Sequence, residues 1–248
     1  MIWLTGDLHR DFTKLDKFNL YLETKYLSKP TKKPREFYVI VCGDFGGVWY
    51  GGIRDEVYLK RFDTYHFTTL FVDGNHENFD ALDFYPVEEF KCGLVNRVSS
   101  KVYRLKRSQV FTIEGKKIFT LGGATSIDKV YRIPHISWWS QENISTEDYD
   151  NMIKQIESNP KVDYIITHDA PTDIVHRISE YFITDSNNYV LEQLDNKMQR
   201  TLWYFGHYHI DKCFNTVDDD GELKNTYMCL YNEFVKLGST KFIKNIID

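Results

Sequence analysis

The chain has 248 residues, of which 42% are hydrophobic and 27% charged, and this composition is typical of a soluble globular protein. A formal net charge of -5 provides no global basic field for gripping nucleic acid, so stable nucleic-acid binding is not expected, although a local groove is not excluded. The apolar runs are too short to span a bilayer, so no membrane contact is expected.

The first third of the chain alternates short apolar runs with segments of helical spacing. Strands are predicted over residues 1–5, 37–42 and 68–73, and helices over residues 12–28 and 55–66. The segment 28–35 carries two prolines and four basic side chains, which is typical of a loop. The predicted order is strand, helix, strand, helix, strand, with polar residues at the strand ends.

The rest of the chain is richer in strands. Strands are predicted over residues 102–105, 110–113, 117–121, 162–167 and 201–205, and helices over about 145–158 and 187–198. Ser145, with Asp148 three residues later, is typical of a helix N-cap. After residue 213 we expect a closing meander around an Asp-Asp-Asp-Gly turn. No repeat or linker interrupts the chain, so a single domain over residues 1–248 is the simplest organisation.

Five polar signatures follow predicted strands, and each begins at a turn. They are Gly6-Asp7-Leu8-His9, Gly43-Asp44, Gly74-Asn75-His76-Glu77, Thr167-His168-Asp169 and Gly206-His207-Tyr208-His209. Any one of them is a weak match, but five in this order are specific. Because open α/β folds place their sites at the carboxyl edge of the sheet, we expect these residues to meet there.

The side chains in these signatures form a mixed set of metal ligands. Carboxylate, amide oxygen and imidazole suit manganese, iron and zinc better than they suit calcium or an all-thiolate zinc site. Five of the eight histidines lie in the signatures. A lone histidine is more often a core or surface residue, but five that each follow a strand favour ligation or catalysis. Two divalent ions side by side indicate hydrolysis of a phosphate ester.

The cysteines and the apolar residues at the N-terminus indicate in which compartment the protein is expected. The four cysteines are widely and irregularly spaced, without a paired-cysteine zinc pattern, which favours reduced thiols. The run Met1-Ile2-Trp3-Leu4 is too short for the apolar part of a secretory signal and leads directly into Asp7. We therefore expect a cytoplasmic protein.

In motif type and order the chain resembles the calcineurin-like metallophosphoesterases, and the matching motifs run from Asp7 to His209. The resemblance implies an α/β (α+β) four-layer sandwich, in which two mixed β-sheets pack face to face with helices outside. It also implies a dinuclear metal centre, with manganese preferred and iron or zinc as alternatives. Its ligands would be Asp7, His9 and His209 for the first ion and Asn75, His168 and His207 for the second, with Asp44 bridging the two.

The resemblance also implies the chemistry. The two ions would lower the pKa of a bridging water, which makes hydroxide available near neutral pH, and would stabilise charge during an in-line displacement at phosphorus. His76 follows the ligand Asn75 directly and, in the family, lies beside the metals without binding them. We assign His76 to protonating or stabilising the leaving oxygen. The alternative is a purely structural role.

Two departures from the family pattern bear on the substrate. Phosphoprotein phosphatases of this superfamily carry an aspartate and an arginine shortly after the bridging aspartate, whereas this chain continues Asp44-Phe45-Gly46-Gly47-Val48-Trp49. The acid that would orient His76 is therefore missing, and its partner is unknown. Many members also have glycine after the first histidine, where this chain has Arg10. Arg10 could bind a substrate phosphate, pair with Asp11 or lie in solvent.

Further candidates for substrate binding lie in two aromatic segments. Trp49 is a candidate for stacking on the substrate, with a hydrophobic plug as the alternative. Residues 121–139 resemble a subgroup of uncharacterised bacterial and prophage-borne members of the family. Arg132 in this segment is a candidate for binding an anionic substrate. For Trp138 and Trp139 we prefer a role in covering the core beneath a long loop.

The expected function is metal-dependent hydrolysis of a phosphate ester. The missing aspartate–arginine pair and the aromatic loop slightly favour a phosphodiester or nucleotide-type substrate over a phosphoprotein. The alternatives are a phosphomonoesterase or protein phosphatase, and a catalytically silent binding scaffold of the same fold. The scaffold is disfavoured because every expected ligand and His76 are present.

Overall fold

The computed structural model describes residues 1–28, 35–244 and 246, and arranges them in two β-sheets with helices. The eight-stranded sheet contains β1 (Ile2–Thr5), β2 (Tyr38–Val41), β3 (Thr68–Phe71), β4 (Val87–Phe90), β5 (Gly93–Arg97), β6 (Val102–Leu105), β13 (Phe234–Lys236) and β14 (Phe242–Ile243). The six-stranded sheet contains β7 (Gln109–Ile113), β8 (Lys116–Leu121), β9 (Tyr164–Thr167), β10 (Leu202–Phe205), β11 (Lys212–Val217) and β12 (Leu223–Cys229). The α-helices are α1 (Thr13–Leu22), α2 (Ile53–Leu59), α3 (Phe79–Leu82), α4 (Thr146–Ser158), α5 (Thr172–Ile178) and α6 (Ser186–Lys197).

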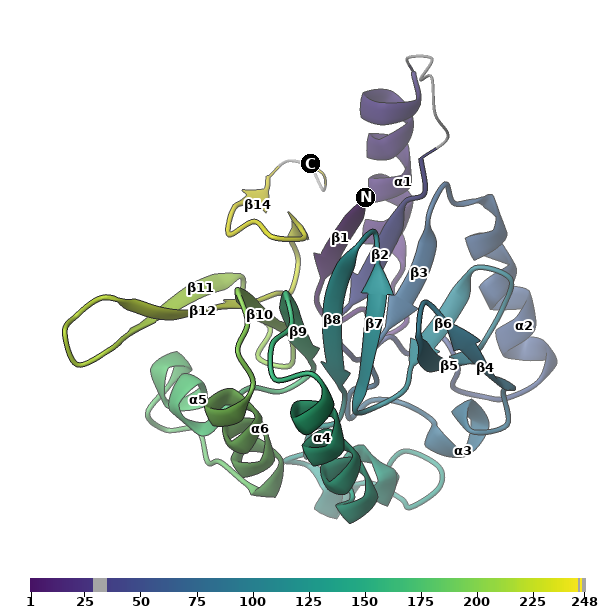
Figure 1. Ribbon diagram of the computed structural model, residues 1–248. Coiled ribbons are helices and arrows are strands. Elements are labelled where there is room, and N and C mark those ends of the chain that lie inside the picture. Colours follow the sequence, from purple (N-terminus) through teal and green to yellow (C-terminus); the bar gives the residue numbers. More distant parts are fainter. Residues whose placement is uncertain (29–34, 245, 247–248) are drawn as a thin grey trace.

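The elements form four layers. Figure 1 shows α1 and α2 on one outer side of the molecule and α4, α5 and α6 on the other, with the two sheets between them. Three clusters of buried hydrophobic side chains fill the three interfaces between these layers. The predicted sandwich of two mixed sheets flanked by helices is therefore confirmed.

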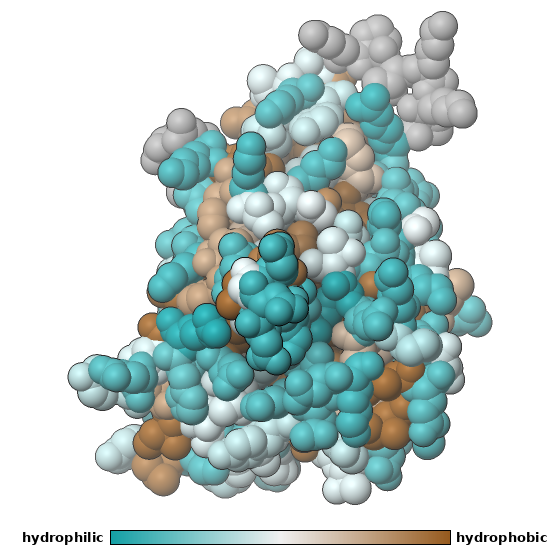
Figure 2. Space-filling model, turned by 60° about the vertical axis from the view of Figure 1, so that its left-hand side comes forward, coloured by the Kyte–Doolittle hydropathy of each residue, from teal (hydrophilic) through white to brown (hydrophobic). Residues whose placement is uncertain are grey.

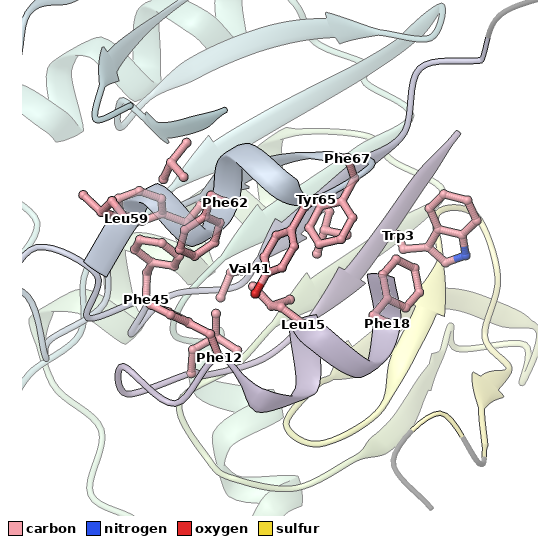
Figure 3. Close-up of a cluster of buried hydrophobic side chains, with 14 of the residues drawn as sticks. Trp3, Phe12, Leu15, Phe18, Val41, Phe45, Leu59, Phe62, Tyr65 and Phe67 are labelled. Atoms are coloured by element: carbon pink, nitrogen blue, oxygen red, sulfur yellow. The ribbon is translucent and has the colours of Figure 1, made fainter. Parts of the chain in front are cut away.

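The alternation of side chains along the central strands explains these clusters. In β1, Ile2 and Leu4 face the other sheet, whereas Trp3 packs under the helices with Phe18 of α1. Figure 3 shows Leu15 and Phe18 of α1 pointing into the same buried cluster as Tyr65. Because central strands have both faces covered, they read as continuous apolar runs rather than as alternating patterns.

Strand order places the signatures at one edge of each sheet. In the larger sheet, with order β14-β13-β1-β2-β3-β6-β5-β4, strands β1, β2, β3 and β6 are parallel neighbours. In the smaller sheet, with order β11-β12-β10-β9-β8-β7, strands β8, β9, β10 and β12 are parallel. Parallel neighbours end at the same edge, so the loops after β1, β2 and β3 lie together, and so do those after β9 and β10.

Most predicted elements are present within a few residues of their expected bounds. The helix expected over 12–28 is α1 followed by a π-helical turn, Glu23–Leu27, and the helix over 55–66 is α2 followed by a 3₁₀ turn, Lys60–Thr64. Ser145 accepts a hydrogen bond from the Asp148 backbone, so the predicted N-cap is confirmed. The loop expected over 28–35 falls mostly on residues 29–34, outside the described residues.

Other elements are missing from the sequence prediction. Neither the short helices α3 and α5 nor the hairpin β4–β5 was expected, because each is too short to display a clear period. The closing meander is only partly correct. Strands β11 and β12 form the expected hairpin, but β12 also runs parallel to β10, and β13 and β14 cross to the larger sheet, where β13 pairs with β1.

Two further properties follow from the described part of the chain. None of its helices is long and apolar enough to cross a membrane. The four cysteines are free thiols, of which Cys42 and Cys229 are buried.

Candidate metal centre

The loops after five strands bring the predicted ligands together. Asp7 and His9 follow β1, Asp44 follows β2, Asn75 follows β3, His168 follows β9, and His207 and His209 follow β10. The two carboxylates are almost fully buried, with 3% of Asp7 and 1% of Asp44 exposed. The site therefore spans both sheets, although two of its residues, His9 and His209, lie 200 positions apart in the chain.

One set of side chains gathers around the Asp7 carboxylate. His209 Nε2 lies 3.1 Å from Asp7 Oδ2, and His9 Nε2 lies 3.9 Å from the same oxygen. The two imidazole Nε2 atoms are only 3.0 Å apart. Ligand atoms on a tetrahedral zinc ion with bonds near 2.0–2.1 Å lie about 3.3 Å from each other, so this spacing suits one shared cation.

A second set gathers around His168, which is fully buried. Its Nε2 atom lies 3.1 Å from Asn75 Oδ1 and 3.4 Å from Asp44 Oδ1. Its Nδ1 atom lies 2.8 Å from the Cys42 carbonyl oxygen, which holds the ring and directs Nε2 toward the ligands. The His207 ring lies beside it, with ring centroids 5.0 Å apart.

Asp44 lies between the two sets. Its Oδ1 atom faces His168, and its Oδ2 atom lies 3.7 Å from His9 Nε2. Asp44 thus offers one carboxylate oxygen to each set. Within the described residues, Asp7, Asp44 and His168 offer three ligand atoms within 4.8 Å of one another, as do Asp7, His9 and His209.

The backbone at these ligands is unusual. His9, Asp44, His207 and His209 have φ values of 45°, 49°, 67° and 51°, in the left-handed region that side chains other than glycine rarely adopt. Such conformations cluster at functional sites, where the surrounding fold holds them in place. Gly74 permits the close approach, because a Cβ atom there would lie 2.0 Å from Asp44 Oδ1.

The electrostatics of the site suit divalent cations. Asp7 Oδ2 is buried and accepts no hydrogen bond, and a buried carboxylate is costly without a positive partner. Burial alone would lower the pKa of His168, but the adjacent Asp44 and Asp7 carboxylates raise it. The negative charge of the two aspartates thus favours a positive charge between them. The surrounding oxygen and imidazole ligands fit a borderline metal ion.

His76 lies beside both sets. Its backbone N–H donates a 2.8 Å hydrogen bond to Asp44 Oδ1, and its ring centroid lies 5.0 Å from that of His9. Its ring is also close enough to His9 and Asp44 for the three to hold an ion. On its other side lies Arg132, whose Nη1 atom is 3.2 Å from His76 Nδ1.

A model of the calcineurin-like phosphoesterase family matches residues 1–211 of the chain. The chain belongs to the calcineurin-like phosphoesterase family. It is accordingly a metal-dependent phosphoric ester hydrolase. No curated protein matches it. Among solved structures, it is similar to a phosphopantetheinyl hydrolase from Mycobacterium tuberculosis, with 12% identity, a TM-score of 0.40 and coverage of 93% of this chain and 89% of that chain.

Several residues of this phosphoesterase that hold the ligands were not singled out from the sequence. Buried Glu77 accepts hydrogen bonds from the backbone N–H groups of Phe45 and Gly46, at 2.7 and 3.1 Å, and so fixes the loop after Asp44. Half-buried Lys14 donates to the carbonyl oxygens of Gly6 and Asp7, at 3.1 and 3.0 Å. Only the position of Glu77 inside a signature could have pointed to it.

The orientation of the Asn75 amide is set by two further residues. Asn75 Nδ2 donates to Ser126 Oγ at 3.1 Å, and Ser126 Oγ donates to Glu142 Oε2 at 2.7 Å. Because the carboxylate can only accept, Ser126 must donate to it and accept from Asn75. The amide oxygen of Asn75 is therefore turned toward His168 and the ligand set.

Of the three predicted substrate contacts, only Arg132 lines the cavity that opens beside the ligands. Arg10 forms a 3.1 Å ion pair with Asp55, a partner other than those expected from the sequence, and its guanidinium lies over the Tyr58 ring. Trp49 packs edge-on against Trp139, whose Nε1 donates to Asp80. The substrate contacts of Arg10 and Trp49 remain predictions without support from the lining of the cavity.

A cavity of about 910 Å³ opens beside the ligands, and the long segment after β8 forms part of it. Its lining includes Asp44, Asn75, His76, His207 and His209, together with Thr125, Ile127, Asp128 and Arg132 of that segment. The first part of residues 124–144, from Thr125 to Arg132, thus lies against the site. Arg107 fastens the far end of the segment by donating to the Gln141, Glu142 and Asn143 carbonyl oxygens.

Proposed function

We propose that this phosphoesterase holds two divalent metal ions, preferably manganese, and hydrolyses a phosphodiester. The observation that carries the proposal is the gathering of possible ligand atoms in two adjoining sets on either side of Asp44. One set contains Asp7, His9 and His209, and the other contains His168 with the Asn75 amide and the His207 ring beside it. Asp7, His9 and His209 would hold one ion and Asn75, His168 and His207 the other, with Asp44 shared. Bound there, the ions would supply a water of lowered pKa and positive charge facing the phosphate oxygens.

His76 is the residue we assign to the leaving oxygen. Burial lowers its pKa to about 4, against the opposing effect of Asp44, so the imidazole is neutral near pH 7. A neutral imidazole has one N–H group to donate and one nitrogen to accept. Arg132 faces both ring nitrogens, with Nη1 3.2 Å from Nδ1 and Nη2 3.4 Å from Nε2. Its guanidinium can donate to whichever nitrogen carries no proton, and the N–H of the other nitrogen can stabilise negative charge on the departing oxygen.

Arg132 takes the place of the aspartate–arginine pair that is missing after Asp44. Its guanidinium is held by Asp128, with Nε 2.8 Å from Oδ1 and Nη2 2.9 Å from Oδ2. A guanidinium fixed in this way, inside the cavity and beside His76, is placed to donate to a phosphate oxygen. The neighbour of His76 therefore comes from a different segment than in the phosphoprotein phosphatases of this superfamily.

The charges around the cavity favour a diester over a monoester. Beyond the ligands, its lining carries Asp128, Asp169 and Asp185 but only one guanidinium, Arg132. A phosphodiester brings one negative charge, whereas a phosphomonoester near neutral pH brings nearly two. The cavity, at about 910 Å³, also has room for the second organic group that a diester carries.

The proposal is tested with metal-stripped protein to which Mn²⁺ is added back, using p-nitrophenyl phosphate and bis(p-nitrophenyl) phosphate. We expect metal-dependent turnover with a higher kcat/KM for the bis ester, lost in Asp44→Asn and strongly reduced in His76→Ala. Faster turnover of the monoester and of phosphopeptides would replace the diesterase by a phosphomonoesterase or protein phosphatase. Two bound ions without any turnover would favour a binding scaffold instead.

A further inference from the structure

The cavity beside the metal centre has a second wall that the proposed chemistry does not use. Five hydrophobic side chains, here called the apolar wall, line it together with the ligands: Ile127, Val175, Tyr181, Phe182 and Ile183. Ile127 comes from the segment after β8, Val175 from α5, and the other three from the connection between α5 and α6. Two separate segments thus place hydrophobic groups at one opening.

Most of this wall is uncovered. The exposed fractions are 97% for Ile127, 95% for Ile183 and 85% for Tyr181. Of the nineteen exposed large hydrophobic side chains among the described residues, nine lie within 127–136 and 181–189, and four of these nine belong to the apolar wall. Figure 2 shows a largely hydrophilic face on which hydrophobic side chains gather in a few patches. Such concentration marks a binding surface, because hydrophobic side chains scattered singly are the usual case.

The apolar wall is joined physically to the metal ligands. Tyr208 lies between His207 and His209 in the chain, and its ring packs against Phe182 with centroids 5.5 Å apart. Its hydroxyl donates to Asp169, which fixes the ring in place. A molecule whose phosphate meets His207 and His209 therefore has its organic group directed along this wall.

The charge of the lining restricts what that organic group is. Among the cavity-lining residues there is no lysine, and the guanidinium of Arg132 already pairs with Asp128 and faces His76. A group with further phosphates would meet Asp169 and Asp185 without a free cation to receive it. A polyphosphate or nucleic-acid strand is thereby disfavoured, and an uncharged group is favoured.

We propose that the apolar wall binds an uncharged, apolar organic group, so that the substrate is a phosphodiester with one such group. The inference rests on the proposed function and adds to it the chemical class of the substrate. The wall acts as a specificity-determining surface, since burying Ile127, Tyr181 and Ile183 against the substrate removes apolar area from water on both sides.

The first arm of the test measures kcat/KM for methyl, butyl and octyl p-nitrophenyl phosphate at concentrations below micelle formation. The leaving group is the same in all three, so only the second group changes. Each fully buried methylene group can raise kcat/KM by up to about fourfold. Because this cavity is open, we expect kcat/KM for the octyl ester to exceed that for the methyl ester by at least about tenfold. The ratio of kcat/KM for the octyl ester to that for the methyl ester should fall toward one in the double variant Tyr181→Ser/Ile183→Ser. It should stay high in Leu223→Ser, which changes an exposed residue of β12 and serves as the control.

The second arm does not depend on turnover. Isothermal titration calorimetry of Mn²⁺-loaded protein compares methylphosphonate with octylphosphonate, and we expect at least about tenfold tighter binding of the octyl compound, reduced by the same double variant. Chain-length-dependent binding without hydrolysis would contradict the proposed function and support the apolar wall. Equal binding and equal turnover across chain lengths, or a preference that the double variant retains, would overturn the inference.

Discussion

The metal ligands and the apolar wall face one cavity but are held by different kinds of structure. Asp7, Asp44 and His168 sit in short turns directly after strands, and almost nothing of them is exposed. Ile127 and Ile183 sit in long connections between elements and are almost fully exposed. The comparison teaches that the strands of the two sheets fix the positions of the metal ligands. The long connections between elements can differ in sequence and length without moving those ligands, and they determine which substrate is accepted.

The largest effect is expected from breaking the ligand side of this comparison. Asp44→Asn should lower kcat/KM for bis(p-nitrophenyl) phosphate on the order of 10³-fold or more, because the shared carboxylate is lost from both ligand sets. Thermal unfolding of the stripped variant serves as the control for folding. Activity within tenfold of the wild type would contradict the bridging role.

The next effect concerns the ion pairs that hold the segment after β8 against the strand that precedes the ligand Asn75. Buried Asp73 pairs with Arg104 and with Arg107, which in turn holds the segment from Gln141 to Asn143. Breaking a buried ion pair typically costs at least about 3 kcal/mol, so Asp73→Asn should lower the free energy of unfolding by about that amount at pH 7. Urea denaturation measures it, with Asp63→Asn on the exposed surface as a matched control.

The same variant tests a pH dependence. Burial would raise the pKa of Asp73, but Arg107 and Arg104 lower it to about 2, below the 3.8 of an unperturbed aspartate. The lowered pKa stabilises the fold above pH 3.8, and that stabilisation, about 2 kcal/mol, is lost as pH falls through 2. The difference between wild type and Asp73→Asn should therefore shrink between pH 4 and pH 2. A difference in the free energy of unfolding that stays constant over this pH range would mean that the charge of Asp73 is not its source.

A smaller effect is expected at the boundary between the two sides. Arg132→Ala should reduce kcat/KM on the order of 10²-fold by removing a donor to the phosphate and the neighbour of His76. Arg132→Lys should recover little, because an ammonium group cannot reproduce the two-point pairing with Asp128. Arg97→Ala, which changes an exposed side chain at the end of β5, is the control. Full activity of Arg132→Ala would remove this residue from the site.

The smallest effect is expected from the residue that orients Asn75. Ser126→Ala removes the hydroxyl that accepts from the Asn75 amide, and loss of such a supporting group typically weakens metal affinity by about 10-fold to 100-fold. We expect about tenfold weaker Mn²⁺ binding by calorimetry, and no change in Ser140→Ala from the same segment. Equal affinity in Ser126→Ala and the wild type would mean that Asn75 is held by other contacts.

The ligand side could be predicted from the sequence because its residues follow strands within one to four positions. An apolar run that ends in a turn with aspartate or histidine carries its own signal, as at Asp44 and His168. The partners could not be predicted, since they depend on how distant segments pack. Ser126 meets Asn75 across 51 positions, and Arg132 meets His76 across 56, so no local pattern links them.

The apolar wall could not be predicted from the sequence for a similar reason. Tyr181, Phe182 and Ile183 form an apolar run of ordinary appearance, which reads equally well as part of a core. Only the folded structure reveals that the run is exposed and adjoins Tyr208 in the cavity. Arg10 illustrates the same limit, because the partner of this charged residue, Asp55, lies 45 positions away in the chain and could not be predicted from its neighbours.

The most direct test of the account is the number of metal ions that the protein holds. Stripped protein dialysed to equilibrium against Mn²⁺ and then subjected to elemental analysis should contain two ions per chain. His209→Ala and His168→Ala should each lose about one, because they belong to different ligand sets. No bound metal, or a single ion whose occupancy is unchanged in both variants, would contradict the dinuclear centre.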